Sequence, residues 1–155
     1  MLLAVFSDSH GNPERMLRAI EHSKPDLVLH LGDGGRDIDK IKSQFPQLPL
    51  TAVRGNCDIS GDLPEKKILN INGVKLLLTH GHLYGVKHTP AMLISEAVTQ
   101  GANAVLFGHT HEPVNYQEQG IFVINPGTAG YPPHQTYAEI EITDSGELFS
   151  RIIRL

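Results

Sequence analysis

Five short apolar runs in this chain each end directly in a polar cluster that contains histidine, aspartate or asparagine. The runs start near residues 2, 27, 50, 74 and 104, and the clusters after them are DSH, GD, GNCD, THGH and GHTH. Apolar runs of this length, bounded by turn residues, are typical of buried strands. Functional residues of open α/β sheets gather beyond the carboxyl ends of the strands. The pattern therefore predicts that the five clusters face one another across one crevice.

The segments between and after these runs complete an α/β pattern. Apolar periodicity predicts a helix that starts at Pro13, with Asn12 as its cap, and further helices over 36–45 and 90–100. The Asn72-Gly73 pair predicts a tight hairpin, and two late strands are expected around 136–142 and 148–153. We therefore expect one domain over residues 1–155, with a partly parallel first sheet and a more antiparallel second sheet.

The composition restricts the class of partner and the compartment. The formal net charge is -4, which argues against the broad basic surface that nucleic-acid binding requires. The single cysteine, Cys57, excludes an internal disulfide and fits a reducing compartment. The first residues form a strand pattern rather than a signal peptide, and no segment resembles a membrane span. We expect a soluble cytoplasmic protein, with a symmetric homodimer as the base-rate expectation.

The side chains in the five clusters are of the types that hold divalent metal ions. Carboxylates together with imidazoles suit Mn²⁺, Fe²⁺, Zn²⁺, Co²⁺ or Ni²⁺, whereas Mg²⁺ prefers more oxygen ligands. A cysteine-rich structural zinc site is excluded because the chain has only one cysteine. The candidate side chains are Asp8, His10, Asp33, Asn56, His80, His82, His109 and His111.

The spacing within the clusters suggests how metal ions would be shared. In an extended segment residues i and i+2 point the same way, so Asp8 and His10 can grip one ion together. His109 and His111 have the same spacing but could divide between two ions about 3.5–4 Å apart. One carboxylate must then bridge the ions. Asp33 is the best candidate because the glycines around it let the backbone come close.

The five motifs, in this order along the chain, resemble those of the calcineurin-like metallophosphoesterase superfamily. The short chain, GNCD in place of the commoner Gly-Asn-His, and the later NPGT are similar to its compact bacterial and archaeal phosphodiesterase branch. The non-catalytic retromer scaffold subunit is a relative of that branch. The resemblance extends from Phe6 to about Thr128. It implies an α/β fold, a four-layered α-β-β-α sandwich of two mixed sheets, with the site between loops at one sheet edge.

The resemblance also implies a dinuclear metal centre and a reaction. The first ion would be held by Asp8, His10, Asp33 and His111, and the second by Asp33, Asn56, His80 and His109. A hydroxide bridging the two ions would attack the phosphorus of a small phosphodiester in line, with Mn²⁺ as the expected metal. The implied protein is a metal-dependent phosphoric ester hydrolase, a phosphodiesterase.

The chain departs from the wider family pattern at Cys57. Many members have a histidine there that protonates the leaving group, and cysteine is a poor substitute in that role. His82 could bind phosphate or donate this proton, and Asp58 could orient a histidine or contact a metal-bound water. The candidate catalytic residues are therefore Asp33, Asn56, His82 and Asp58. Without a strong proton donor, activated aryl diesters are expected to be cleaved more readily than alkyl monoesters.

Two alternatives stay open at this point. A scaffold with the same fold could bind proteins without useful turnover, but we would expect it to have lost one of the histidines at 10, 80, 109 and 111, which this chain keeps. A nuclease is disfavoured by the acidic balance of charge. Other polar residues have structural explanations: His30 as a hydrogen-bonded strand residue, Asn125 as a turn residue, and Arg54 as a solvated or salt-bridged residue.

Overall fold

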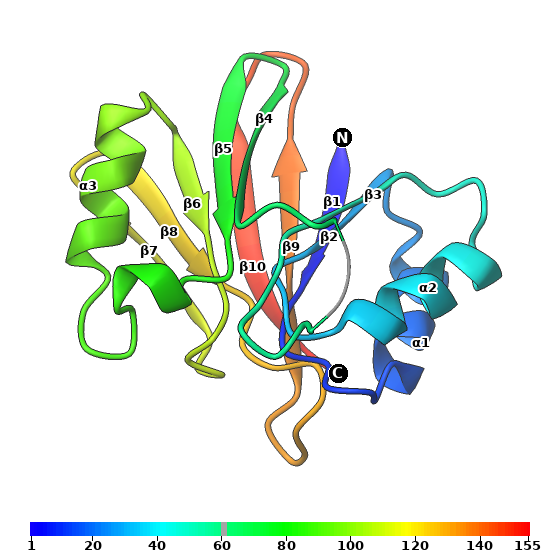
Figure 1. Cartoon of the computed structure of the whole chain (residues 1–155). Coiled ribbons are helices and arrows are strands. Elements are labelled where there is room, and N and C mark those ends of the chain that lie inside the picture. The colour runs from blue at the N-terminus through cyan, green and yellow to red at the C-terminus, as the bar shows by residue number, and fades with distance from the viewer. Residues whose placement is uncertain (60–61) are drawn as a thin grey trace.

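Two five-stranded mixed sheets pack face to face in the computed structural model, which describes residues 1–59 and 62–155 (Figure 1). The first sheet contains, in spatial order, β10 (Leu148–Arg154), β9 (Thr136–Ile142), β1 (Leu2–Phe6), β2 (Leu27–His30) and β3 (Leu50–Ala52). Strands β1, β2 and β3 run parallel, whereas β9 pairs antiparallel with β1 and with β10. The carboxyl ends of β1, β2 and β3 therefore lie at one edge of this sheet.

The second sheet has the same balance of parallel and antiparallel pairs. It contains, in spatial order, β4 (Lys66–Ile71), β5 (Val74–Thr79), β6 (Ala104–Leu106), β8 (Ile121–Asn125) and β7 (Val114–Glu118). Strands β5, β6 and β8 are parallel, with antiparallel β4 and β7 at the edges. The prediction of a more antiparallel second sheet is wrong, because the two late strands β9 and β10 join the first sheet beside β1.

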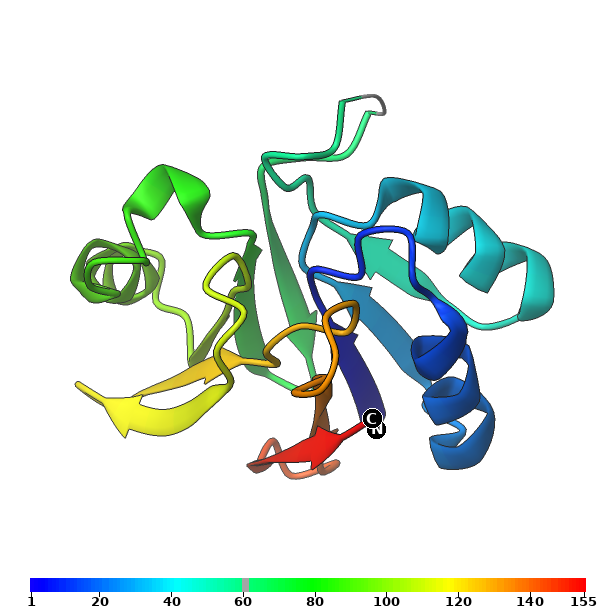
Figure 2. The same ribbon diagram turned by 90° about the horizontal axis from the view of Figure 1, so that it is seen from below.

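Helices cover both outer faces of the sheet pair (Figure 2). Helices α1 (Glu14–Ser23) and α2 (Gly35–Gln44) lie against the first sheet, and α3 (Ala91–Thr99), preceded by the short 3₁₀ helix η1 (His82–Tyr84), lies against the second. Buried apolar residues form three clusters, one between the sheets and one under each helical layer. The four-layered α-β-β-α sandwich is thereby confirmed.

Two local details differ from the sequence expectation. The residue that caps α1 is Pro13, without a side-chain hydrogen bond, whereas Asn12 Nδ2 donates to the backbone oxygen of Gly130 over 3.1 Å. Strand β7 was not predicted because four of its five residues are exposed and only Val114 and Tyr116 alternate with polar residues, which is too short a pattern to identify a strand. The Asn72-Gly73 turn between β4 and β5 is confirmed, with both residues at positive φ. None of the described helices combines the length and apolar character that a membrane span needs.

Candidate metal centre

The polar clusters from both sheets meet at one place. Each cluster directly follows a strand: Asp8 and His10 follow β1, Asp33 follows β2, Asn56 follows β3, His80 follows β5, and His109 and His111 follow β6. Strands β1, β2 and β3 run parallel in the first sheet, and β5 and β6 run parallel in the second, so the carboxyl ends of these strands share one edge in each sheet. The two edges are joined directly, because the backbone N–H of His109 donates to Asp8 Oδ2 over 3.0 Å.

One group of donor atoms surrounds Asp8 Oδ1. His111 Nε2 lies 3.1 Å from this oxygen and His10 Nε2 lies 3.8 Å from it. Both Asp8 Oδ1 and His10 Nε2 are buried without a hydrogen-bond partner among the described residues. Buried polar atoms that lack a partner are costly, and a cation among these three side chains would satisfy them. The group therefore fits a divalent metal ion.

Asp33 Oδ2 links this group to a second one. It lies 3.9 Å from His10 Nε2 and 3.4 Å from His80 Nε2. His80 Nε2 in turn lies 3.1 Å from Asn56 Oδ1 and 3.2 Å from His109 Nδ1. This oxygen of Asp33 thus stands between the two sets of side chains, which is the position that a carboxylate shared by two ions requires.

Most of these ligand-type residues have a left-handed backbone. Eight non-glycine residues in the described part of the chain have positive φ, and five of them are Asp8, His10, Asp33, His109 and His111. Each such residue costs about 1–3 kcal/mol and persists only where the surroundings impose it, which is typical of functional sites. The extended-segment premise for the i, i+2 pairs is therefore wrong. Tight turns, not strand pleating, bring the paired side chains together.

Asp33 and His80 each form a hydrogen bond through the atom that faces away from the cluster, which directs their remaining ligand atom into it. Asp33 Oδ1 accepts from the backbone N–H of Cys57 over 2.8 Å, which leaves Oδ2 free. His80 Nδ1 lies 2.8 Å from the backbone oxygen of Leu31, so Nδ1 carries a proton and Nε2 faces the cluster. Bonds of this kind orient metal ligands and fix the histidine tautomer.

The two carboxylates stay ionised in this environment. Burial opposes the charge of Asp8, but the nearby imidazoles of His10, His111 and His80 hold its pKa far below the ordinary 3.8. Burial also opposes the charge of Asp33, but His80 and the backbone N–H of Cys57 lower its pKa to about 2. Both side chains are therefore anionic at neutral pH and available as metal ligands.

The histidine pKa values follow the same charges. The nearby Asp8 carboxylate raises the pKa of His10, and for His80 the Asp33 and Asp8 carboxylates outweigh burial and raise its pKa. Burial, together with the charge of His80, lowers the pKa of His109 to about 4. The site thus attracts positive charge at the carboxylates and keeps a neutral imidazole at its edge, which suits a bound cation.

Asp58 ties together the two loops that carry Asp33 and Asn56. Its Oδ2 accepts from the backbone N–H groups of Asp33 and Gly55, each over 2.8 Å. Its Oδ1 accepts from those of Gly34 and Gly35 over 3.0 and 2.9 Å. Both oxygens are thus directed at backbone donors, and charge-assisted bonds of this kind are strong. The contacts of Asp58 are those of a positioning residue.

A buried network supports the loop after β1. Ser9 Oγ donates to Asp37 Oδ2 over 2.6 Å and lies 3.2 Å from His30 Nε2. The backbone N–H of Gly11 donates to the same oxygen of Asp37 over 2.8 Å. The interpretation of His30 as a hydrogen-bonded strand residue is confirmed. Asp37 carries no sequence signal for this role, because helix α2 could equally have exposed it.

Asn125 supports the loop after β6 from the other sheet. Its Nδ2 donates to the backbone oxygen of Gly108 over 2.9 Å and to Thr110 Oγ1 over 3.0 Å. Its Oδ1 accepts from the backbone N–H of Gly127 over 2.9 Å, which builds the predicted turn. The same side chain therefore forms its own turn and holds the GHTH loop.

Tyr131 forms part of the rim of the cluster and was not predicted. Its ring stacks on that of His111, with centroids 5.0 Å apart and an interplanar angle of 25°, and lies 5.0 Å from the ring of His10. The side chain keeps 49% of its surface exposed. Its sequence context, a glycine- and proline-rich loop, gives no sign of an aromatic wall.

His82 and Cys57 also lie at the rim. The ring centroid of His82 is 6.1 Å from that of His109, and its Nε2 is 3.8 Å from Glu65 Oε2. Burial and the charge of His80 lower the pKa of His82, so its ring is neutral at pH 7. The Cys57 side chain is exposed, but partial desolvation and the neighbouring carboxylates raise the pKa of its thiol, which argues against a thiolate nucleophile. The salt-bridged interpretation of Arg54 is confirmed by its pairing with Glu65.

Comparison with known proteins agrees with this geometry. Residues 1–145 match the calcineurin-like phosphoesterase superfamily domain. The probable metallophosphoesterase YsnB of Bacillus subtilis is 34% identical, with 85% of this chain and 77% of YsnB covered. Phosphodiesterase YfcE of Escherichia coli is 30% identical, with 96% of this chain and 90% of YfcE covered. Vps29 of Entamoeba histolytica, crystallised with Zn²⁺, shares the fold at a TM-score of 0.79 and 23% identity, with 99% of each chain covered.

Proposed function

Because this chain belongs to the calcineurin-like phosphoesterase superfamily, we propose that it is a metal-dependent phosphodiesterase that hydrolyses small phosphodiesters. The main support is the arrangement around Asp33, whose free oxygen lies between His10 on one side and His80 on the other. The similarity to a protein named phosphodiesterase supports the choice of diester over monoester.

The donor atoms fit two divalent ions that share Asp33. The first ion would bind Asp8, His10, Asp33 and His111, and the second would bind Asp33, Asn56, His80 and His109. The mixture of carboxylate, imidazole and amide ligands suits first-row metals, with Mn²⁺ as the proposed ion. When bound, the ions would supply polarisation of the phosphoryl oxygens and activation of water for attack on phosphorus.

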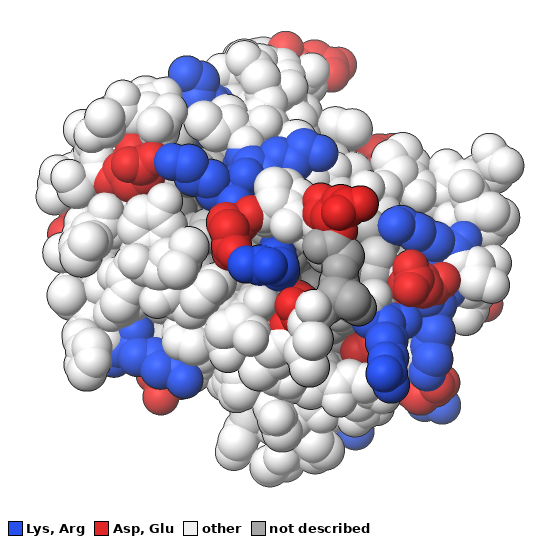
Figure 3. Space-filling view, in the orientation of Figure 1, with Lys and Arg blue, Asp and Glu red and all other residues white. Residues whose placement is uncertain are grey.

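The charges of the site and of the surrounding surface favour a small anionic substrate. Two divalent ions would bring four positive charges, and the carboxylates of Asp8 and Asp33 would balance two of them. The loaded site would therefore attract a phosphate ester although the net charge of the chain is -4. On the face drawn in Figure 3, basic and acidic side chains lie interspersed among uncharged residues. That distribution favours a small substrate over a nucleic acid, which would need a broad basic surface.

The rim residues His82 and Cys57 are weak proton donors, which favours leaving groups that depart without being protonated. His82 is the proposed contact for the leaving group, and its neutral ring at pH 7 makes it a weak source of protons. Cys57 is exposed, but partial desolvation and the neighbouring carboxylates raise the pKa of its thiol, so it keeps its proton and is a weaker acid than a histidine. We therefore expect aryl diesters to react faster than alkyl monoesters, and the rate to rise steeply as the leaving group becomes more acidic.

Hydrolysis of bis(4-nitrophenyl) phosphate with added Mn²⁺ tests the proposed function. The variant Asp33→Asn removes the shared carboxylate, and Asp39→Asn removes an exposed carboxylate of α2 as the matched control. We expect the first variant to lose activity by about 100-fold or more and the second to match the unmodified protein. Equal rates in all three proteins would contradict the proposal. A protein that binds Mn²⁺ but cleaves no diester would instead support the scaffold alternative.

A further inference from the structure

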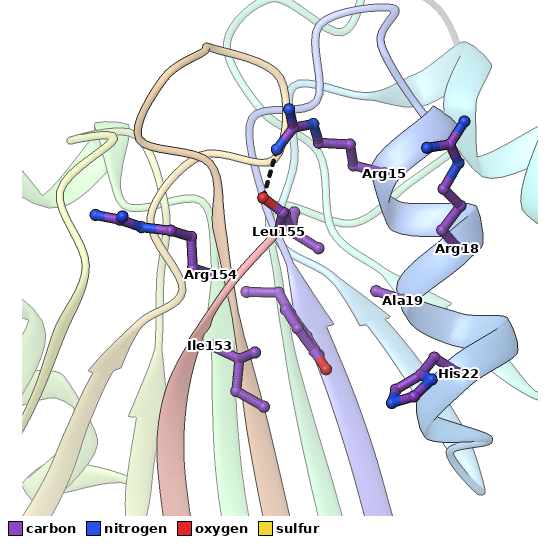
Figure 4. A pocket seen from close by; sticks show the side chains of 8 residues that line it. Arg15, Arg18, Ala19, His22, Ile153, Arg154 and Leu155 are labelled. Carbon is purple, nitrogen blue, oxygen red and sulfur yellow. Dashed lines mark hydrogen bonds between the residues drawn. The ribbon is translucent and has the colours of Figure 1, made fainter.

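A cleft lies between helix α1 and the last strand, outside the metal cluster (Figure 4). Its volume is about 300 Å³, at the lower end of the range of small-molecule sites. None of the residues that line it belongs to the metal centre or has an acidic side chain. They are Arg15, Arg18, Ala19, His22, Tyr137, Ile153, Arg154 and Leu155.

One wall of this α1 cleft is basic. Arg15, Arg18 and His22 are spaced three and four residues apart, so they lie on one face of α1. Arg15 donates to an oxygen of the Leu155 carboxylate at the end of the chain, which holds its guanidinium over one end of the cleft (Figure 4). This carboxylate balances the charge of Arg15, so the unbalanced positive charge of the wall comes from Arg18. A guanidinium has five N–H donors, so the others stay available to a ligand. Arg18 forms no ion pair with any described residue, although the chain as a whole is acidic.

The floor of the cleft is apolar. Ala19, Ile153 and Leu155 are half-buried there, and Tyr137 beneath them is only 4% exposed. The ring of Tyr137 stacks on Phe6, with centroids 5.2 Å apart and planes at 13°, so it forms a fixed surface. Its hydroxyl already donates to Glu139 Oε1 over 2.7 Å and is not free for a ligand.

Glu139 does not cancel the basic character of the wall. Its second oxygen accepts from Arg151 Nε over 2.9 Å, so this carboxylate is already paired with a cation. The cleft therefore combines positive charge along one wall with an apolar, rigid floor. A bare inorganic anion would leave the floor uncovered, and an uncharged apolar molecule would leave the arginines without a counter-charge.

We propose that the α1 cleft binds a small amphipathic anion, a carboxylate or phosphate group attached to an acyl chain or an aryl ring. The head group would accept hydrogen bonds from Arg15 and Arg18, and the apolar part would lie against Ile153 and Leu155. The site is independent of the metal centre, and it does not rest on the proposed phosphodiesterase activity.

NMR titration of the full chain, loaded with diamagnetic Zn²⁺, tests the proposal. Octanoate and octyl phosphate serve as amphipathic probes, and 1-octanol and inorganic phosphate serve as the neutral and the purely ionic comparison. The methyl signals of Ile153 and Leu155 report binding in the α1 cleft, separately from any binding at the metal centre. The relative response to the two amphipathic probes shows which head group is preferred.

The proposal predicts saturable shifts of these methyl signals with at least one amphipathic probe. The variant Arg18→Gln should weaken that binding about fivefold or more, because it removes a charge-assisted contact. Arg36→Gln, which removes an exposed arginine of α2 outside the cleft, should change it less than about twofold. Tighter binding of 1-octanol or of inorganic phosphate than of either probe would overturn the proposal. Equal losses in the two variants, or no shift at Ile153 and Leu155, would overturn it as well.

Discussion

The Oδ2 atom of Asp8 accepts a 3.0 Å hydrogen bond from the backbone N–H of His109, which is 101 residues further along the chain. This bond joins the carboxyl end of β1 in one sheet to that of β6 in the other. It also fixes the Asp8 carboxylate so that Oδ1 faces His10 and His111. The metal centre therefore depends on the relative placement of two sheets, and substitutions that move either loop should be felt at the site.

A substitution at Gly108 tests whether the metal centre depends on the close approach of the β6 loop to the β1 loop. A Cβ atom there would lie 1.9 Å from Ser7 Oγ and 2.7 Å from Asp8 Oδ2, so Gly108→Ala must displace the loop. We expect a loss of about 1–3 kcal/mol in the free energy of unfolding and about tenfold weaker Mn²⁺ binding. Denaturant unfolding and calorimetric titration measure the two effects.

The matched control for this change is Gly120→Ala in the β7–β8 turn. Gly120 has φ +78 and no atom within 4 Å of an added Cβ, so this variant adds backbone strain without touching the site. It should lose stability but bind Mn²⁺ normally. Normal Mn²⁺ binding by Gly108→Ala would contradict the prediction.

Asp58→Asn should disturb the site without removing a ligand. An asparagine amide would place N–H donors opposite backbone N–H groups that now donate to the carboxylate. We expect a destabilisation of about 3 kcal/mol and a fall in kcat/KM of about tenfold or more, with a weaker affinity for Mn²⁺.

Asp26 offers a comparison for the Asp58 variant, because its carboxylate also accepts a backbone N–H, that of Leu2, over 2.7 Å. Asp26→Asn should lose some stability and keep full activity. If both asparagine variants lose stability and both keep kcat/KM, then Asp58 has no role in positioning Asp33.

His30 should make the stability of the metal-free protein depend on pH. Burial lowers the pKa of His30 below the ordinary 6.5, so the unfolded chain binds a proton that the folded chain does not. The contribution of neutral His30 to the free energy of unfolding is complete above its unfolded pKa of about 6.5. It is lost as the pH falls below this value, by up to about 1.4 kcal/mol per pH unit. Urea unfolding of the unmodified protein and of His30→Gln, with EDTA present, isolates this contribution. The stability advantage of the unmodified protein should shrink from about pH 7.5 to about pH 5.5, and a constant difference would contradict the buried neutral state.

Tyr131 should affect substrate binding more than metal binding. Its half-exposed ring beside His111 offers a surface on which an aryl ester can stack. Tyr131→Ala should raise KM for bis(4-nitrophenyl) phosphate about two- to tenfold with little change in kcat. Tyr116→Ala removes a tyrosine of β7 that is 38% exposed and should leave KM unchanged. An unchanged KM in the Tyr131 variant would show that the ring does not contact substrate.

The strand pattern was sufficient to predict an α/β fold and the gathering of the polar clusters, whereas the four layers were predicted from the resemblance to the phosphoesterase family. Apolar runs that end in Asp33 or His80 carry this information locally, because the strand pattern and the position of the polar residue are both visible in the sequence. The Asn72-Gly73 hairpin was predictable for the same reason, since a two-residue turn is specified by its own residues.

The details that were missed depend on contacts between distant segments. The left-handed backbone at Asp8 and His109 accompanies a hydrogen bond between loops of the two sheets, and aspartate and histidine tolerate this conformation without specifying it. The four backbone donors around Asp58 come from two loops that only the fold brings together. The partner of a late strand such as β9 is likewise a property of the whole sheet. The ligand roles of the clustered residues stay predictions.

The central claim is that side chains from both sheets hold two divalent ions that share Asp33. Anomalous diffraction at the manganese edge, from crystals grown with MnCl₂, tests this most directly. The account predicts two peaks about 3.5–4 Å apart, with the Asp33 carboxylate in contact with both. A map with no peak in the cluster, or with a single ion on Asp8, His10 and His111 that does not touch Asp33, would contradict it.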